Sequence, residues 1–296
     1  MRPLVGVPSA LLRHWLRNRE VAIDVDASIQ QNRNAWNRLV RRGGRHTLPA
    51  RDDEFHDPLA ALDSYGWLGQ DVRDQRVLCL AAGGGRQSAL FAAAGAQVTV
   101  VDISPEMLAI DRQVAQERGL ELHAVEASMD NLSMFDVASF DIVAQPVSTC
   151  YVSHVRAVYR EVARVIVPGG LYVSQHKQPA SLQAATDPSP RGYELIEPYY
   201  RRGPLPNVEN NPLREDGALE YLHSLEELVG GLCREGFVIE DLVEPAHAQQ
   251  RAAAGSFKHR CLYLPPYLRI KARRIGPPTG VGGSDAGPGK RVWTPS

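Results

Sequence analysis

The chain has 296 residues, of which 44% are hydrophobic and 23% are charged, and these are the proportions of a globular protein with a sizeable core. Its formal net charge of −1 excludes a bulk basic field that would draw it to nucleic acid or anionic lipid. No apolar run approaches the ~20 residues that span a bilayer. We therefore expect neither a nucleic-acid partner nor a membrane partner.

The cysteines form no CxxC pair, and their spacing matches no zinc pattern. They are Cys79, Cys150, Cys233 and Cys261. This usage predicts reduced thiols in a cytoplasmic protein and no metal site. Arginines interrupt residues 1–19, which lack a clean apolar stretch and a cleavage site, so no signal peptide is predicted.

Hydrophobic periodicity predicts a regular order of elements along the chain. An amphipathic helix is expected at 26–40, followed by irregular chain at 43–75 with a short helix around 58–65. Strands are then expected at 76–80, 97–101, 121–125, 140–144 and 171–174, with helices at 86–94 and 105–118 and a third from 155 to the break at Pro168-Gly169-Gly170. Beyond a Pro-, Asn-, Arg- and Tyr-rich stretch (176–222), a helix opened by Ser224 and closed by Gly236 precedes strands at 237–243 and 257–264. The Gly/Pro-rich tail 276–296 is expected to be disordered.

Strand and helix alternate regularly between residues 76 and 174. This order predicts a parallel sheet with right-handed crossovers. Ligands on such sheets bind beyond the carboxyl ends of the strands. A glycine turn, Gly83-Gly84-Gly85, follows the first strand, and Asp102 ends the second, so both fall where this rule places a ligand.

The glycine turn and the acid together predict an adenosine cofactor. Glycines admit close backbone approach and positive φ. A carboxylate at the end of the second strand can accept both ribose hydroxyls. The pyrophosphate pattern G-x-G-x-x-G is incomplete, because Ser88 stands three residues after Gly85. S-adenosylmethionine (SAM) carries no phosphate and needs no anion cradle, which favours it over a dinucleotide.

Four segments, in the expected order, resemble the motifs of class I SAM-dependent methyltransferases. They are residues 77–87 (VLCLAAGGGRQ), 100–108 (VVDISPEML), 139–143 (SFDIV) and 161–171 (EVARVIVPGGL). The helix and strand at 224–243 extend the resemblance. It implies an α/β fold: a Rossmann-like, seven-stranded, mostly parallel sheet with helices on both faces and a reversed last hairpin. An N-terminal helical segment and a cap insertion would be added to it.

The resemblance also implies roles for individual residues around SAM. Ala81, Gly83 and Gly85 would wrap the methionine portion. Asp102 would hold the ribose, and Ile103 would lie on the adenine. The remaining cofactor residues would be Ser128 and Met129 at the adenine edge and Gln145 near the sulfonium. Trp36 is expected either to close over the cofactor from the N-terminal helix or to be an ordinary apolar anchor.

Three positions depart from the family pattern. The first motif usually has an acid where Cys79 stands and a glycine where Ala81 stands, and Ser128 replaces the acid at the adenine edge. These departures leave room for altered chemistry. They motivate a second hypothesis, a SAM-binding protein that does not methylate, either a lyase- or cyclase-like enzyme or a regulator.

Methyl transfer from a sulfonium requires alignment and exclusion of water more than any one side chain. A base could still be needed, and histidine titrates near neutral pH. The candidates for catalysis are His176, His154 and Tyr151. The candidates for substrate contact are Tyr199, Tyr200, His223 and Arg201.

The long insertion favours an enclosed site, so we predict a SAM-dependent methyltransferase acting on O, N or C of a small molecule, as a monomer or homodimer. An NAD(P)-dependent oxidoreductase on the same sheet and a pure interaction module are weaker alternatives. The expected division is a lid segment 1–75, a SAM-binding core 76–175, a substrate cap 176–222, a C-terminal part 223–275 that completes the sheet, and the tail 276–296.

Overall fold

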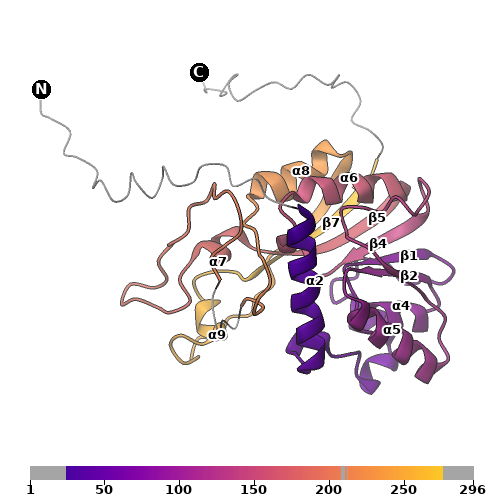
Figure 1. Ribbon diagram of the computed structural model, residues 1–296, viewed down its shortest axis with the longest axis horizontal. Coiled ribbons are helices and arrows are strands. Elements are labelled where there is room, and N and C mark those ends of the chain that lie inside the picture. Colours follow the sequence, from indigo (N-terminus) through magenta and orange to yellow (C-terminus); the bar gives the residue numbers. More distant parts are fainter. Residues whose placement is uncertain (1–24, 208–210, 212, 276–296) are drawn as a thin grey trace, which may run out of the picture.

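The computed structural model describes residues 25–207, 211 and 213–275, and its centre is a seven-stranded sheet (Figure 1). The strand order is β3-β2-β1-β4-β5-β7-β6, and β7 runs antiparallel to the other six strands. The strands are β1 (Arg76–Leu80), β2 (Gln97–Asp102), β3 (His123–Glu126), β4 (Phe140–Gln145), β5 (Ile166–Lys177), β6 (Phe237–Val243) and β7 (Tyr267–Arg274). The expected Rossmann-like sheet with a reversed last hairpin is therefore confirmed.

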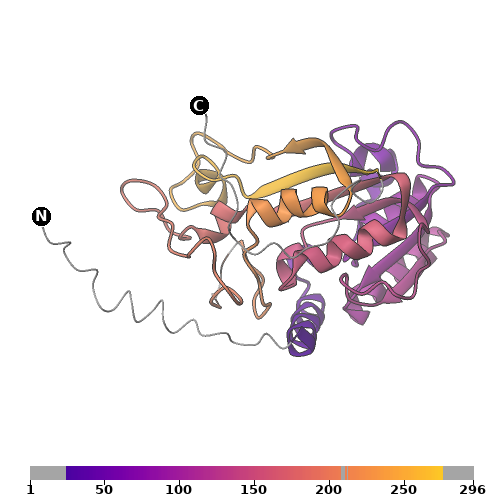
Figure 2. The same cartoon turned by 90° about the horizontal axis from the view of Figure 1, so that it is seen from above.

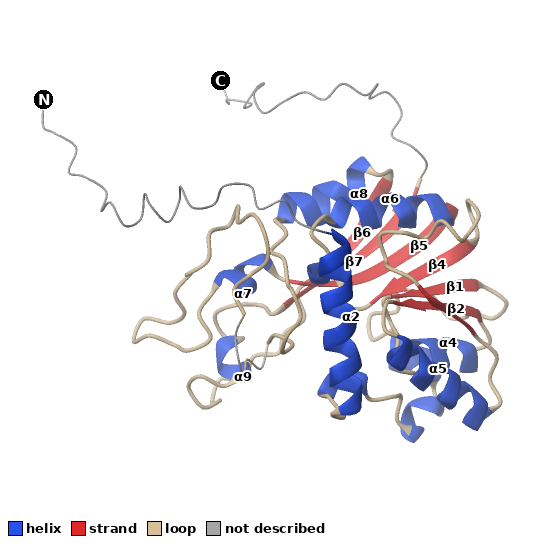
Figure 3. Ribbon diagram, in the orientation of Figure 1, coloured by secondary structure: helices blue, strands red, loops and turns tan. Residues whose placement is uncertain are grey.

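Helices cover both faces of this sheet (Figure 3). The α-helices are α2 (Val25–Arg41), α3 (Pro58–Leu62), α4 (Gln87–Ala93), α5 (Pro105–Arg118), α6 (Val155–Val165), α7 (Pro179–Gln183), α8 (Gly231–Arg234) and α9 (Phe257–Arg260). The shorter turns are η1 (Arg45–Thr47), η2 (Asp52–Phe55), η3 (Thr149–Tyr151) and the π-turn η4 (Glu226–Gly230). None of the helices in the described ranges is long and apolar enough to cross a membrane.

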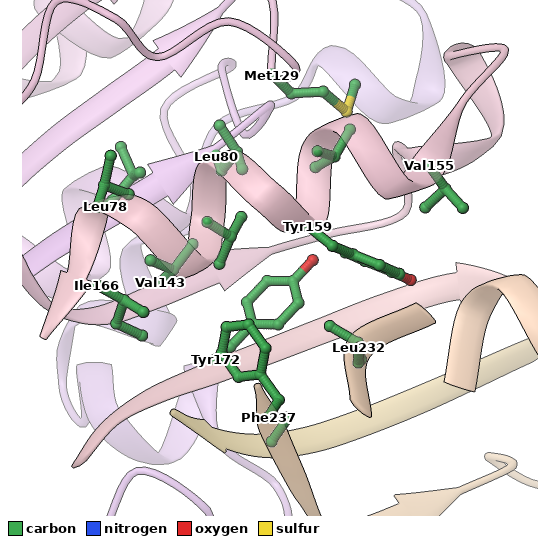
Figure 4. Packing of buried hydrophobic residues seen from close by; sticks show 14 of the residues in the cluster. Leu78, Leu80, Met129, Val143, Val155, Tyr159, Ile166, Tyr172, Leu232 and Phe237 are labelled. Carbon is green, nitrogen blue, oxygen red and sulfur yellow. The ribbon is translucent and has the colours of Figure 1, made fainter. Parts of the chain in front are cut away.

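Each face of the sheet packs against its helices through a separate apolar cluster. On one face, α6 and α8 lie over β1, β4, β5 and β7, and Tyr159 of α6 is fully buried against Tyr172 of β5 and Leu232 of α8 (Figure 4). On the other face, Phe91 of α4 and Leu108 of α5 cover β1 and β2. Burying aliphatic and aromatic side chains on both faces is what stabilises a parallel sheet, so its carboxyl edge forms a rigid base for a site.

The last strand lies further along the chain than predicted. We expected a strand at 257–264, but this segment forms α9 because the Ser256 hydroxyl accepts the His259 amide and caps a helical turn. The strand is β7 instead, and its alternate residues Leu268, Ile270 and Ala272 are buried. Alternation of residue types over so short a segment therefore does not distinguish a strand from a helical turn.

Two other predictions near the sheet are corrected in detail. The fifth strand begins at Ile166 and runs through Pro168-Gly169-Gly170, not from Leu171. The helix after Ser224 consists of η4 and α8, in which Leu228 and Leu232 are buried and Leu225 is 42% exposed. A capping box begins it, since the Ser224 amide donates to Glu227 and the Glu227 amide donates to the Ser224 hydroxyl. The predictions for residues 1–19 and 276–296 lie outside the described residues.

The helix α2 joins the core to the insertion that follows β5 (Figures 1 and 2). At its C-terminal end it meets α5, where the Ser104 hydroxyl donates to the Asn37 side chain. Nearer its start, the Asn32 amide donates to the carbonyls of Tyr151 and Leu219, and its oxygen accepts the Leu219 amide. The buried Asn32 thus fixes the N-terminal helix beside the carboxyl edge of the sheet.

Ala81 stores backbone strain at the end of β1, and its replacement by glycine is expected to stabilise the fold. Its φ is +48°, a left-handed conformation that costs an L-residue roughly 1 kcal/mol and costs glycine almost nothing. Ala81→Gly should therefore raise the free energy of unfolding by about 1 kcal/mol in urea titration. An unchanged or lower stability would show that the turn relaxes around the alanine.

Candidate cofactor and acceptor site

A cavity of about 340 Å³ lies at the carboxyl ends of β1, β2, β4 and β5. This volume is within the range of small-molecule sites. Its walls come from the N-terminal segment, the first βα turn, the ends of the strands and the insertion. They comprise Trp36, His46, Leu48, Ala81, Ala82, Gly83, Gly84, Arg86, Gln87, Asp102, Ile103, Met107, Ala127, Met129, Pro146, Val147, Ser148, Tyr151, Gln175, Lys177, Glu215 and Tyr267.

Asp102 and the glycine turn form one end of the cavity. The Asp102 carboxylate accepts the backbone amides of Gly83 at 3.0 Å and Ser104 at 2.9 Å. A Cβ on Gly83 would lie 2.7 Å from Met107 Cβ and 2.9 Å from Asp102 Oδ2, so only glycine fits between them. Burial raises the pKa of Asp102 to about 6, although the two amide hydrogen bonds oppose this shift.

Most residues expected to hold the cofactor line this end, but three lie behind it. Those that line the cavity are Ala81, Gly83, Asp102, Ile103 and Met129. Gly85 donates its amide to Asp111, and the Ser128 hydroxyl donates to Asp130. Gln145 is buried, where its amide donates to the Ser148 hydroxyl at 2.8 Å and its oxygen accepts the Tyr172 hydroxyl. Gly85 and Ser128 therefore lie behind the walls of this cavity, whereas Gln145 lines a smaller cavity of about 190 Å³ beside it.

His176 lies on the opposite face of the sheet from the cavity. Successive residues of β5 alternate between faces, so Gln175 and Lys177 point into the cavity while His176 packs edge-on to Tyr159 of α6. Its ring is fully buried between the hydroxyls of Thr149 and Ser174, both 2.8 Å away. Burial lowers its pKa to about 3. This placement does not suit the base expected from the sequence.

The buried His176 should make the protein sensitive to acid. A histidine whose pKa falls from 6.5 to about 3 on folding contributes stability above pH 6.5, and this is lost as the pH falls towards 3. Wild type should therefore lose about 2 kcal/mol more than His176→Asn between about pH 6.5 and about pH 5. Urea titrations at both pH values measure the difference, and the exposed His123→Asn serves as control. Equal losses in all three proteins would contradict the placement.

Of the other two catalytic candidates, Tyr151 lines the cavity and His154 does not. Tyr151 is buried at the end of η3, where Trp36 of α2 meets its ring edge-on at a centroid distance of 5.5 Å. His154 is exposed and directly precedes α6. Since Trp36 also lines the cavity, it is the N-terminal helix that covers Tyr151 on this side.

The four candidates for substrate contact lie outside the cavity walls. The Tyr199 hydroxyl accepts the Leu225 amide, and Tyr200 is 83% exposed. Arg201 pairs with Glu197 and donates to the Pro204 carbonyl. His223 is buried, with Nε2 3.0 Å from the carbonyls of Thr149 and Val152. Tyr200 packs edge-on to Tyr199, and nothing in the contacts of the four side chains directs them at a ligand in the cavity.

The other end of the cavity is a buried ionic network, of which only Tyr151 was among the candidates from the sequence. Lys177, at the end of β5, directs Nζ at the carboxylates of Glu215 (2.9 Å) and Glu220 (3.1 Å) and at the Leu213 carbonyl (2.9 Å). The Tyr151 hydroxyl donates to the same Glu215 oxygen as Lys177. The second Glu215 oxygen lies 3.8 Å from His46 Nε2. The insertion thus supplies a carboxylate to a site built by the sheet.

The charges of this network are set by burial and by close partners. Burial alone would raise the pKa of Glu215, but the Lys177 charge and the hydrogen bonds from Tyr151 and Lys177 lower it to about 2. Burial raises the pKa of Glu220. Burial opposes the charge of Lys177, yet the carboxylates around it raise its pKa. Lys177 and Glu215 are therefore a charged pair facing the cavity.

Of the pair Lys177 and Glu215, only Lys177 lies in a segment whose sequence pattern indicates which way its side chain points. The alternation of β5 could have identified Lys177. Residues two apart in a strand share a face, so Lys177 lies on the same face as the apolar Leu171 and Val173, which pack towards α4. Glu215 stands in irregular chain with no period, so its position depends on long-range contacts alone.

Comparison with known proteins agrees with this architecture. Residues 78–174 match the model of a methyltransferase domain. A Bacillus subtilis (strain 168) protein named "Uncharacterized methyltransferase YbaJ" is 32% identical over 235 residues, which are 74% of this chain and 91% of that protein. A ubiquinone biosynthesis O-methyltransferase of Xanthomonas oryzae pv. oryzae (strain PXO99A) is 32% identical over 39% of this chain, which spans about half (49%) of that relative.

Solved structures share the fold. A SAM-dependent methyltransferase from Mesorhizobium loti superposes with a TM-score of 0.59 at 23% identity, over 74% of this chain and 100% of the other. A geranyl diphosphate C-methyltransferase from Streptomyces coelicolor A3(2), solved with S-adenosyl-L-homocysteine (SAH), gives 0.58 at 16% identity, over 84% of this chain and 98% of the other.

The sheet order, the glycine turn and the acid that ends β2 define a class I SAM-dependent enzyme. Given its likeness to the Bacillus protein over nearly the whole of that relative, the chain belongs to the methyltransferase family and uses SAM as its cofactor.

Proposed function

We propose that this enzyme moves the methyl group of SAM to an O, N or C atom of a small-molecule acceptor by in-line displacement and releases SAH. The observation that carries the proposal is one cavity with two chemically different ends, the glycine turn with Asp102 and the Tyr151–Lys177–Glu215 cluster. A cavity of about 190 Å³ adjoins it and shares Arg86, Gln87, Pro146 and Gln175, which adds room for a second ligand.

At the cofactor end, the residues present fit SAM. The close approach of Gly83 to Asp102 leaves a turn without side chains, which suits the methionine portion of SAM beside Ala81. Asp102 would accept the ribose hydroxyls, and Ile103 and Met129 would flank the adenine. Gly85 and Ser128 would act from behind these walls, and Gln145 would act from the adjoining cavity that it lines. When bound, SAM supplies the electrophilic methyl group.

At the acceptor end, Glu215 would receive a hydrogen bond from the hydroxyl or amine of the acceptor. Its low pKa keeps it ionised, so it is a weak base and a good hydrogen-bond acceptor. Tyr151 and Lys177 hold the carboxylate in place. We propose that these three residues orient the acceptor and do not remove its proton. This role agrees with a reaction that depends on alignment.

The parts of the chain would divide the work as follows. Residues 1–75 would form a lid over the core 76–175, residues 176–222 a cap over the acceptor, and residues 223–275 the rest of the sheet. Trp36 of α2 and Glu215 of the insertion both reach the cavity, which supports these assignments.

We further propose a small acceptor and a cytoplasmic monomer or homodimer, with neither nucleic acid nor membrane as partner. The net charge of −1 offers no general attraction to polyanions. The relative named for ubiquinone biosynthesis supports an acceptor of small size.

Calorimetric titration with SAM, SAH and NADH tests the cofactor site, and a screen of small acceptors for SAH release tests the reaction. Micromolar SAM binding with acceptor-dependent SAH release is expected. SAM binding without SAH release from any acceptor would favour the non-methylating alternative, and NADH binding in place of SAM would overturn the proposal.

A further inference from the structure

Asp111 of α5 receives three hydrogen bonds, two from the turn between β1 and α4 and one from the first turn of α4. Its carboxylate accepts the amide of Gly84 at 2.9 Å, the amide of Gly85 at 3.0 Å and the hydroxyl of Ser88. The side chain is fully buried and lies outside the cavity walls. Asp111 therefore holds the glycine turn from behind, on the side away from the cavity.

The turn needs such a support because its conformation is open only to glycine. Gly84 and Gly85 have φ values of +108° and +73°. A Cβ on Gly85 would lie 2.9 Å from Val114 and 3.2 Å from Ile110, both on α5. Glycines lose much conformational freedom when they are fixed, so a partner that binds two successive amides restricts the turn strongly.

Asp102 and Asp111 together use three successive amides of the turn, those of Gly83, Gly84 and Gly85. In dinucleotide sites, the backbone amides of such a turn bind the pyrophosphate. Here they are already bound by carboxylates of the protein, whose charge also repels phosphate. A cofactor that carries a sulfonium and no phosphate escapes this repulsion.

We propose that Asp111 is a positioning residue that fixes the glycine turn for SAM and keeps its amides from a pyrophosphate, an inference that rests on the proposed cofactor site. Asp111 acts through the backbone and does not contact the cofactor. This role accounts for a buried carboxylate on a helix whose other inward positions are apolar, such as Met107, Leu108 and Val114.

Asp111→Asn and Ser88→Ala test the proposal, with SAH titration and thermal unfolding as readouts. Asparagine keeps the volume but turns an NH₂ group towards one of the amides. We expect SAH to bind about tenfold or more weakly to Asp111→Asn, the loss typical of one charge-assisted hydrogen bond, and a few-fold more weakly to Ser88→Ala. Val158→Ala, in α6 on the other face of the sheet, should lower the melting temperature while SAH affinity stays unchanged.

Wild-type affinity for SAH in Asp111→Asn, or in Ser88→Ala if the first variant does not fold, would overturn the proposal. Loss of SAH affinity in Val158→Ala in proportion to its stability would do the same, because the effect would then follow stability alone. Wild-type protein should bind SAH and not NADH. If wild type fails to bind SAH, the proposed cofactor site fails, whereas NADH binding beside normal SAH binding contradicts the exclusion of pyrophosphate by Asp111.

Discussion

Asp102→Asn is expected to bind SAH about 100-fold more weakly than wild type at neutral pH. The carboxylate at this strand end is the acceptor for two ribose hydroxyls, and losing one or two charge-assisted hydrogen bonds costs about 3 kcal/mol. Alanine is a poorer test, because Asp102 is buried and also accepts the amides of Gly83 and Ser104. Asparagine keeps its shape, and calorimetric titration with SAH measures the effect.

The exposed Asp136→Asn provides the matched control and should bind SAH like wild type. Equal affinities for Asp102→Asn and the control would remove Asp102 from the cofactor site. A smaller loss shared by both would indicate a general effect of net charge.

The raised pKa of Asp102 gives this site a pH dependence with a definite sign. Ribose hydroxyls donate to the ionised carboxylate, so binding favours that form. Since the pKa in the free protein is about 6, SAH affinity should be flat above about pH 6 and fall up to tenfold per pH unit below it. Titrations across this range should show the slope in wild type and not in Asp102→Asn. If the variant keeps the slope, the pH dependence belongs to another group, such as Asp111, whose charge also acts on Asp102.

The fold was predictable because most of its elements have a local signal. β1 matches its predicted bounds, and β2 and β4 end one residue later than expected. Between β1 and β4, runs of β-branched residues alternate with helices bounded by caps, such as Ser104 before α5 and Gly119 after it. Prediction failed at β7 and α9, where segments of a few residues carry too little pattern to distinguish strand from helical turn.

The two ends of the site differ in the same way, because only the cofactor end has a local sequence signal. The cofactor end follows the first two strands directly, so its residues could be found from the sequence. The acceptor end depends on which face of β5 each residue takes and on how the insertion folds back. The fifth strand was predicted to end at residue 174, whereas β5 continues to Lys177, so its alternation directs Lys177 and not His176 into the cavity. Glu215 reaches the cavity only through contacts with residues far away in sequence.

The second large effect is expected for Lys177→Met, which should lower the free energy of unfolding by about 3 to 5 kcal/mol. Lys177 is 8% exposed, and all three of its Nζ contacts are internal, two of them to carboxylates. Methionine fills a similar volume but leaves Glu215 and the fully buried Glu220 facing each other without the cation between them. The loss arises because both carboxylates lose the cation that they share, although Arg214 stays 3.4 Å from Glu220. Urea titration measures it.

Lys271→Met is a matched control on the adjacent strand β7. Lys271 pairs with Glu240 at 3.2 Å in a partly exposed position, and such pairs contribute about 1 kcal/mol or less. A loss at Lys177 no greater than at Lys271 would mean that water or proton uptake relieves the carboxylates. In that case Glu215 would be protonated or solvated in the variant, and the acceptor end would not be the rigid charged surface that orientation of an acceptor requires.

The double variant Lys177→Met/Glu215→Gln separates the effect of charge from that of side-chain volume. If adding Glu215→Gln restores part of the stability that Lys177→Met loses, then the charge, and not the volume of the side chain, stabilises this end of the cavity.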